Sequence, residues 1–360
     1  MQMPFPSDLR GEEMMKTFVR ETILNLKGYE TKNTPYVYKL DANEGKTLFF
    51  SDQATSERED FNRYPDNEAT VLCEVMGKFL GVPTENIVAG NGSSEMIELI
   101  MKTFIDTGDG VLSFTPSFSM YEVFTNIYSG RFFSVPSRRD FSLDVDALIA
   151  KANEIKPKVI LLCNPNNPTG AFLTEAEIKK VIEETNAIIV VDEAYIEFSD
   201  GSFVNQVNQY ENVIVLRTVS KAFGLASIRL GFMVANKEVI NIIKKVKPPY
   251  NLNSLSQKYG IEALQKTEKM SRYVLEIKQE REKLYQEMKK LNIEVYPSQA
   301  NFLFFKSTLV DLAERLQEKG ILIRQFSGDL AWYYRVTIGE KEENSAFLNG
   351  VKEMVSHASS

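Results

Sequence analysis

The chain has 360 residues, of which 43% are hydrophobic and 25% charged, as is ordinary for a globular protein of about two domains. Its formal net charge of −7 argues against a nucleic-acid-binding protein, which normally carries a basic surface. No apolar run approaches the roughly 18 residues that a membrane-spanning helix needs. We therefore expect neither nucleic acid nor a membrane as a partner.

Cysteine and histidine are scarce, which removes several kinds of site. The two cysteines, Cys73 and Cys163, form no C-x-x-C pair, and the single histidine, His357, lies in a polar tail. A metal site, or a nucleophile activated by histidine, is therefore not expected. The first residues are polar and lack the apolar core of a signal peptide, so we expect a reduced, cytoplasmic setting.

Residues 1–45 have a mixed composition and are interpreted as an N-terminal arm. From about residue 68 to 247, strand-like and helix-like segments alternate. Several of the strands are nearly continuous apolar runs, which is typical of strands covered on both faces in a parallel α/β sheet. We predict a large domain, residues 46–247, with a mostly parallel central sheet whose strands lie at 87–89, 110–114, 131–135, 158–163, 187–192, 212–218 and 230–234.

The helix that follows the 158–163 strand begins with a capping box formed by Thr174 and Glu177, and we expect it to end near residue 184. Pro248 and Pro249 interrupt the alternation and mark the predicted domain boundary. The remaining residues, 248–360, are predicted to form a smaller α+β domain. Its expected elements are helices at 268–291 and 309–319 and strands at 300–306, 321–324 and 334–338.

Lys221 follows the buried strand 212–218 and is the most informative residue of the chain. A lysine at the end of a buried strand is partly desolvated, which lowers the pKa of its amine and makes it a better nucleophile. Such an amine can form a Schiff base with an aldehyde. Taken alone, Lys221 is better interpreted as a solvated surface lysine, but three further motifs favour the catalytic interpretation.

The first of these motifs is the heptad Asn164–Gly170 (NPNNPTG), at the carboxyl end of the strand 158–163. Ligands bind outside the carboxyl ends of strands in open α/β sheets. Asn, Pro and Gly are also common in ordinary turns, so the composition alone is not informative. The whole heptad is specific, and Asn167 is its candidate ligand-binding residue.

The second motif contains Asp192, which ends the strand 187–192, and Tyr195, which follows three residues later. A carboxylate at the end of a buried strand is costly unless it is paired. Asp192 could cap a helix, or it could face a protonated ring nitrogen of a ligand. In the second case the Tyr195 hydroxyl could reach the same ligand.

The third motif, GNGSS at residues 90–94, lies between a strand and a helix and ends in Ser93 and Ser94. Amides at a helix N-terminus bind anions, although a glycine-rich turn of this kind is common. The motif matches neither a dinucleotide-binding fingerprint nor a P-loop. Together the four features supply an amine, a carboxylate, donors to a ring oxygen and a phosphate cradle, which is the set that pyridoxal 5′-phosphate (PLP) needs.

With these motifs the chain resembles the fold-type-I, aspartate-aminotransferase-like PLP-dependent enzymes, and within them the histidinol-phosphate aminotransferase family. The resemblance extends from DANE at residues 41–44 to RVTIG at 335–339. Its finer markers are NRYPD (62–66), KPPYN (247–251) and PSQANF (297–302). It implies an α/β fold with a large PLP-binding domain and a smaller α+β C-terminal domain.

The resemblance also implies roles for the cofactor-binding residues. Lys221 would bind the PLP aldehyde and act as general base, and Asp192 would keep the pyridine nitrogen protonated. Asn167 and Tyr195 would bind the phenolic oxygen of the ring. Phe118 would stack on the ring, where many relatives have tyrosine, although plain core packing is the simpler interpretation of its sequence. The phosphate would be held by Ser93, Ser94, Ser220 and Arg229.

Further implied roles concern the substrate and the neighbouring subunit. Tyr64 resembles the tyrosine that reaches the phosphate of the neighbouring subunit's cofactor, which implies a homodimer. Arg335 is expected to bind a substrate α-carboxylate through two parallel hydrogen bonds. The implied reaction is transamination of L-histidinol phosphate with 2-oxoglutarate, giving imidazole acetol phosphate and glutamate, in histidine biosynthesis.

The two substrates differ at the end that is distal to the amino group. Histidinol phosphate carries a phosphate there, and glutamate carries a carboxylate. We expect Arg324 to bind either group, assisted by Tyr64 and Asn43, although Arg324 could equally be a surface arginine at a strand edge. The alternatives on this scaffold are a threonine-phosphate decarboxylase, a broad aromatic amino-acid aminotransferase and a non-catalytic PLP-fold binding module.

Overall fold

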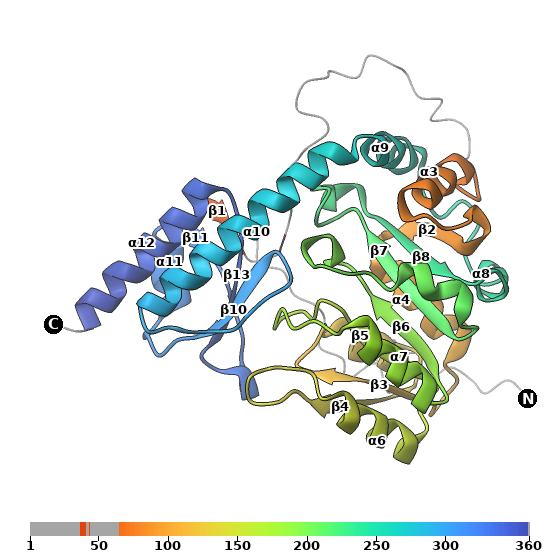
Figure 1. Cartoon of the computed structure of the whole chain (residues 1–360), viewed down its shortest axis with the longest axis horizontal. Helices are drawn as coiled ribbons and strands as arrows, with labels where there is room; N and C mark the ends of the chain where they lie inside the picture. Colours follow the sequence, from red (N-terminus) through yellow and green to blue (C-terminus); the bar gives the residue numbers. More distant parts are fainter. Residues whose placement is uncertain (1–36, 41–42, 44–64, 359–360) are drawn as a thin grey trace, which may run out of the picture.

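The computed structural model describes residues 37–40, 43 and 65–358. At its centre lies a seven-stranded sheet in which β8 is antiparallel to its neighbours β2 and β7, and all other neighbouring strands are parallel (Figure 1). In sheet order, the strands are β2 (Ile87–Asn91), β8 (Leu230–Ala235), β7 (Val213–Thr218), β6 (Ile188–Asp192), β5 (Val159–Cys163), β3 (Gly110–Thr115) and β4 (Arg131–Pro136). All seven predicted strands and the mostly parallel sheet are confirmed.

Helices cover both faces of this sheet, as the apolar strands require. Ile160 and Leu162 of β5 face one helical layer, whereas Leu161 faces the other, and all three are fully buried. Burying each such side chain stabilises the fold by roughly 1.5–3 kcal/mol. One layer contains α3 (Thr70–Leu80), α6 (Val145–Ile155), α7 (Glu175–Glu184) and α9 (Ser254–Gln265), and the other α4 (Gly92–Phe104), α5 (Met120–Ile127) and α8 (Lys237–Lys244). The predicted capping box of Thr174 and Glu177 begins α7.

A second group of elements lies beside the large sheet and contains the C-terminal residues (Figure 1). Its four-stranded sheet is antiparallel, in the order β12 (Arg324–Gln325), β13 (Tyr333–Thr337), β10 (Phe302–Lys306), β9 (Glu294–Val295). Two short strands, β1 (Tyr38–Lys39) and β11 (Ile321–Leu322), form a separate parallel pair. The single strand predicted at 321–324 is therefore wrong, because its two halves pair in different sheets. The accompanying helices are α11 (Leu312–Glu318) and α12 (Lys341–Ala358).

The long helix α10 (Thr267–Lys290) connects the two parts. Arg281 on this helix donates hydrogen bonds to the carbonyl oxygens of Phe198, at 3.2 Å, and Ala300, at 2.7 Å. Phe198 belongs to the large part and Ala300 to the small one, so α10 holds them together. Across the residues that the structure describes, no helix combines the length and the apolar character needed to cross a membrane.

The domain boundary predicted at residue 248 stays a prediction. Helix α9, which follows that position, packs against α3 and β8 at the side of the large sheet (Figure 1). Apolar side chains of both parts also belong to one continuous core. The short 3-10 helices are η1 (Thr84–Asn86), η2 (Ile196–Phe198), η3 (Val204–Gln209), η4 (Ala226–Ile228) and η5 (Gly328–Leu330).

Candidate active site

Three of the predicted motifs meet at the carboxyl-terminal edge of the large sheet. Strands β5, β6 and β7 are adjacent and parallel, with Cys163 opposite Asp192 and Asp192 opposite Leu216. The segments that follow these strands, which include Asn164–Gly170 and Lys221, therefore lie on either side of Asp192. This is the edge at which open α/β sheets bind ligands.

Lys221 lies three residues beyond the end of β7, and its side chain is half-buried. Its Nζ is 5.6 Å from the centroid of the Tyr195 ring. The charge of Lys221 also favours the ionised form of Asp192, which places the amine near both residues of the second motif. The structure thus brings the amine, the carboxylate and the phenol together.

Asp192 is 3% exposed and accepts two hydrogen bonds. The Tyr121 hydroxyl donates to its Oδ2 at 2.8 Å, and the Ala194 amide donates to its Oδ1 at 3.2 Å. Burial raises the pKa of Asp192 to about 6, against the lowering effects of these bonds and of Lys221. Asp192 does not cap a helix, since the N-cap of η2 is Tyr195.

The Tyr195 hydroxyl joins segments that are distant in sequence. It accepts hydrogen bonds from Nδ2 of Asn43, at 3.3 Å, and from Nδ2 of Asn167, at 3.4 Å. Oδ1 of Asn167 in turn accepts a short hydrogen bond from Nη1 of Arg335. Burial raises the pKa of Tyr195 to about 12, so its hydroxyl is protonated at neutral pH. The site therefore includes residues from both sheets.

Asn43 is fully buried, and its side chain is held by Thr337 of β13. The Thr337 hydroxyl donates to Oδ1 of Asn43 at 2.9 Å and accepts from the Asn43 amide at 3.0 Å. Asn301 donates to the Asn43 carbonyl oxygen at 3.1 Å. These bonds position Asn43 to support Tyr195, and its predicted contact with substrate stays a prediction.

Arg335 and Arg324 lie opposite one another in the antiparallel pair β12–β13. Side chains that are directly opposite in such a pair point to the same face of the sheet. Arg335 is 8% exposed, with its guanidinium 5.3 Å from the Phe302 ring centroid. Arg324 is exposed, 5.9 Å from the Phe326 ring centroid. Arg324 thus shares a face with a residue of the site while remaining open to solvent, and its contact with substrate stays a prediction.

The N-terminus of α4 has the features of an anion site. Ser93 and Ser94 are the second and third residues of the helix, where backbone amides have no partner within the helix and the helix dipole favours negative charge. A Cβ added to Gly92 would lie 2.6 Å from Nη2 of Arg229, so the guanidinium lies directly against the first turn. A cation and several amides therefore converge at this point.

Because Gly231 on β8 has no side chain, the N-terminus of α4 can lie close to the end of β7. Gly231 is opposite Thr218, and a Cβ added to Gly231 would lie 2.3 Å from the carbonyl carbon of Gly92. Ser220 is 6% exposed, and its Oγ accepts a hydrogen bond from Oγ1 of Thr218 at 2.9 Å. The α4 N-terminus, with Ser93 and Ser94, therefore lies against Arg229 and close to the end of β7, which Ser220 follows.

Phe118 is half-buried and lies edge-on to Tyr121, with the ring centroids 5.5 Å apart. Because Tyr121 binds Asp192, Phe118 lies one side chain away from the site, and its stacking role stays a prediction. Tyr64 lies outside the described residues.

Tyr121 and an ion-pair trio centred on Arg217 are buried at this edge and were not predicted from the sequence. Tyr121, one helical turn after Phe118, binds Asp192. Arg217 on β7 forms ion pairs with Glu193, at 3.2 Å, and Glu197, at 2.6 Å, and all three side chains are at most 7% exposed. This trio holds the turn that carries Tyr195. A charged residue within an otherwise apolar strand was the available signal for Arg217.

The residues present fit PLP. The buried carboxylate of Asp192 suits a protonated ring nitrogen. The side chains of Asn167 and Tyr195, which are hydrogen-bonded to one another, suit a phenolic oxygen. The α4 N-terminus with Arg229 suits a phosphate. Within the described residues, no group of three or more acidic, histidine or cysteine side chains is arranged to hold a metal ion.

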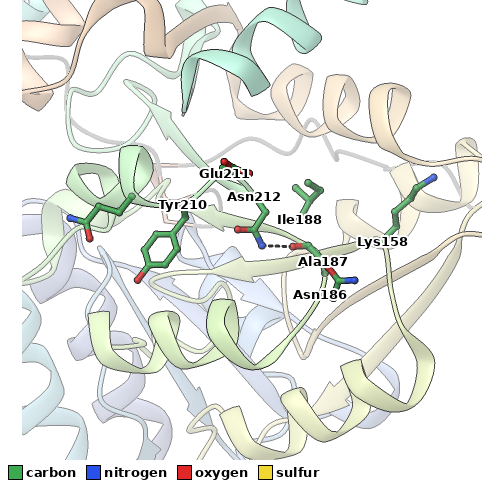
Figure 2. A pocket seen from close by; sticks show the side chains of 8 residues that line it. Lys158, Asn186, Ala187, Ile188, Tyr210, Glu211 and Asn212 are labelled. Carbon is green, nitrogen blue, oxygen red and sulfur yellow. Dashed lines mark hydrogen bonds between the residues drawn. The ribbon is translucent and has the colours of Figure 1, made fainter.

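A surface hollow of about 510 Å³ lies at the opposite edge of the same sheet (Figure 2). It is lined by residues at the amino-terminal ends of β5, β6 and β7, such as Lys158, Ile188 and Asn212. The Asn212 amide already binds the Ala187 carbonyl oxygen at 2.8 Å, and the Lys158 ammonium binds Asp109 at 2.6 Å. Among the predicted site residues that the structure describes, none lines this hollow.

Comparison with known proteins identifies the family. The family model of class I and II aminotransferases matches residues 31–351. The histidinol-phosphate aminotransferase of Thermoanaerobacter pseudethanolicus is 42% identical over 351 residues, which cover 95% of this chain and 100% of that protein. The crystal structure of histidinol-phosphate aminotransferase from Sinorhizobium meliloti, in complex with pyridoxal-5′-phosphate, has a TM-score of 0.84 at 20% identity, covering 94% of this chain and 98% of that one.

The corresponding enzyme from Clostridium acetobutylicum has a TM-score of 0.76 at 27% identity, covering 83% of this chain and 92% of that one. These likenesses extend over both sheets and confirm the predicted fold class. The chain therefore belongs to the family of class I and II aminotransferases.

Proposed function

We propose that this protein uses PLP to transfer an amino group from L-histidinol phosphate to 2-oxoglutarate, forming imidazole acetol phosphate and glutamate in histidine biosynthesis. The observation that carries the proposal is the convergence of Lys221, Asp192 and Tyr195 at the carboxyl edge of the large sheet. The name shared by relatives 37–42% identical over nearly the whole chain supports the choice of substrate.

The chain's own residues would hold the cofactor at both ends. The Lys221 amine binds its aldehyde, and Asp192 binds its ring nitrogen. Asn167 and Tyr195 bind its phenolic oxygen, and Phe118 packs on its ring. The phosphate is bound by the α4 amides with Ser93, Ser94, Ser220 and Arg229. When bound, PLP supplies an electron-withdrawing ring that stabilises negative charge on the substrate carbon.

Two proton positions are then controlled by protein side chains. Asp192, as a carboxylate, stabilises a proton on the ring nitrogen, which maintains the electron-withdrawing character of the ring. Once the substrate amine has taken its place at the aldehyde, the freed Lys221 Nζ would accept the proton from the substrate carbon that carries the amino group. The Tyr195 hydroxyl, protonated at neutral pH, remains a hydrogen-bond donor throughout.

We assign the substrate ends to the two arginines of the β12–β13 pair. Arg335 binds the α-carboxylate of glutamate, for which its planar guanidinium is suited. Arg324, with Tyr64 and Asn43, binds the distal phosphate or carboxylate. Because both arginines point to the same face of one sheet, a single substrate can contact both.

We also propose that the protein acts as a homodimer in the cytoplasm, with Tyr64 reaching the neighbouring subunit's phosphate site. Exposed apolar side chains on α3, on α9 and at Tyr250 support a subunit interface. Val71 of α3 is 55% exposed, Leu255 of α9 is 38% exposed, and α3 packs on α9. Tyr250 is 46% exposed, and its amide binds Asn67 at 2.7 Å. Light scattering on the purified protein tests the dimer, and a monomeric mass contradicts it.

The function is tested by half-reactions on the purified, PLP-loaded protein. Borohydride reduction followed by mass spectrometry should locate the cofactor on Lys221. Histidinol phosphate should then bleach the visible absorbance of the bound cofactor faster than phenylalanine does, and glutamate should also react. An adduct on another lysine contradicts the site. Faster reaction with phenylalanine favours a broad aromatic aminotransferase, and release of CO₂ from threonine phosphate favours the decarboxylase.

A further inference from the structure

Tyr121 is a fully buried residue in the first turn of α5, and no role in the site was predicted for it. Its hydroxyl donates to Oδ2 of Asp192 at 2.8 Å. The Ala194 amide donates to Oδ1 at 3.2 Å. Within the described part of the chain, these two donors bind the Asp192 carboxylate, one at each oxygen.

We propose that Tyr121 is a positioning residue that fixes the Asp192 carboxylate and keeps it ionised where it meets the ring nitrogen of the cofactor. This inference rests on the proposed function, because it assigns Asp192 to that nitrogen. The site needs a negative charge in a place from which water is largely excluded. Burial opposes such a charge, and a hydrogen bond donated to the charged form favours it.

The chemistry of Tyr121 makes it a permanent donor. Burial, with Asp192 beside it, raises its pKa well above the ordinary range, so the phenol keeps its proton at any working pH. Asp192 can therefore only accept at Oδ2. With the Ala194 amide at Oδ1, the plane of the carboxylate is fixed from both sides.

Other titratable groups surround Asp192, and they cannot replace Tyr121. The Lys221 ammonium favours the ionised carboxylate through its charge. Cys163 on β5 has its pKa raised to about 12 by burial, and Tyr195 likewise to about 12, so both are neutral. Since Lys221 is itself a reacting group, its charge is not available at every stage of turnover. The hydrogen bond from Tyr121 to Asp192 is available at every stage of turnover.

The Tyr121→Phe variant separates this role from simple packing. It retains the ring that packs edge-on against Phe118 and removes only the hydroxyl. The first measurement is the carboxyl titration of Asp192 in the full-length, cofactor-free protein, by NMR with ¹³C-labelled aspartate. The Asp192 signal is identified by its absence in Asp192→Asn. We expect the midpoint to rise by about one pH unit or more in Tyr121→Phe.

A second measurement uses the loaded protein but does not depend on its activity. With ¹⁵N-labelled PLP, the ring nitrogen should be protonated in the wild type and less so in Tyr121→Phe. The matched control is Tyr334→Phe, another tyrosine that is nearly fully buried, whose ring stacks on Phe305. This control should change neither the Asp192 midpoint nor the nitrogen signal.

An unchanged Asp192 midpoint in folded Tyr121→Phe overturns the inference. If that variant does not fold, 3-fluorotyrosine at position 121 provides the test, because it keeps the shape and is a stronger donor. It should lower the Asp192 midpoint, and no change there is equally decisive against the inference. Failure of the proposed function would be distinguishable, since the wild type would then bind no PLP at Lys221 while the cofactor-free titration remained measurable.

Discussion

The two edges of the large sheet carry similar residue types in different environments. At the amino-terminal edge, Lys158 lines the surface hollow (Figure 2). It is 45% exposed and binds Asp109 at 2.6 Å in a surface ion pair. At the carboxyl edge, Lys221 is half-buried beside Tyr195 and Asp192. Both lysines adjoin buried strands, so adjacency to a strand does not by itself make a reactive amine. The carboxyl edge differs because buried polar groups from several segments converge there.

The sharpest test of this comparison removes one lysine from each edge. Lys221→Ala should reduce amino transfer from histidinol phosphate by at least about 10⁴-fold, because the group that binds the cofactor and moves the proton is lost. Lys158→Ala should change the rate by less than about twofold, since exposed ion pairs contribute little. Single-turnover absorbance measures both, and comparable losses in the two variants would remove the distinction between the edges.

Asp192→Asn should lower the rate of the same half-reaction by roughly 10²–10³-fold, because the ring nitrogen loses its charged partner. Stopped-flow absorbance under saturating substrate measures this rate. The matched control is Asp109→Asn at the amino-terminal edge, which should leave the rate unchanged. A rate in Asp192→Asn within threefold of the wild type would contradict the assignment of Asp192 to the ring nitrogen.

Asp192 and Asp109 should make opposite contributions to the pH dependence of the stability of the cofactor-free protein. Burial raises the pKa of Asp192 from 3.8 to about 6, so its favourable protonated form stabilises the fold below about pH 4, and this stabilisation is lost as the pH rises through 6. The change amounts to about 3 kcal/mol in the free energy of unfolding. The measurement is urea unfolding of the wild type and Asp192→Asn at pH 4 and pH 8. The free energy of unfolding of the variant, relative to that of the wild type, should be higher at pH 8 than at pH 4 by this amount.

Asp109 should behave in the opposite way. The hydrogen bond from Lys158 lowers the pKa of Asp109, so its contribution is present above its ordinary pKa and is lost as the pH falls. Asp109→Asn should therefore cost a small amount of stability at pH 7 and nothing at low pH, as measured by the same unfolding series. If Asp109→Asn lost stability only at acidic pH, the prediction for Asp109 would be contradicted.

Arg324→Ala should raise the KM for histidinol phosphate by about 10–100-fold with little change in PLP affinity, because a charged hydrogen-bonding partner of the phosphate is lost. Steady-state kinetics and a PLP titration measure the two quantities. Arg315→Ala, in the nearby helix α11 of the C-terminal part, is a control that should leave KM unchanged. An unaltered KM in Arg324→Ala would make Arg324 an ordinary surface arginine.

The smallest effect expected for a substitution at the site concerns its phosphate end. Gly231→Ala should weaken PLP binding by about tenfold, because the new Cβ would meet Gly92 at 2.3 Å and displace the start of α4. Gly201→Ala is the control, since its Cβ would lie 3.8 Å from the nearest described atom, Cζ of Phe172. Absorbance titration with PLP compares them, and equal affinities would place the phosphate elsewhere.

Much of this arrangement was predictable from local patterns. Apolar runs identify β5, β6 and β7, and the carboxyl ends of neighbouring parallel strands must meet at one edge, so Asn167, Asp192 and Lys221 are expected together. The strand predicted at 321–324 failed for a tertiary reason. Ile321 pairs with Tyr38, whereas Arg324 pairs with Arg335, and a local β-pattern does not specify which sheet edge is available.

The amino-acid order alone specified the seven strands of the large sheet, the capping box of α7 and the segments that carry the chemistry, because these depend on periodicity and on residues a few positions apart. Only the folded chain specified the partners of those residues. Tyr121 meets Asp192 across 71 positions, Asn43 meets Tyr195 across 152, and Arg335 meets Asn167 across 168. No local pattern encodes such contacts, because they form only when strand order and helix packing have brought the segments into register.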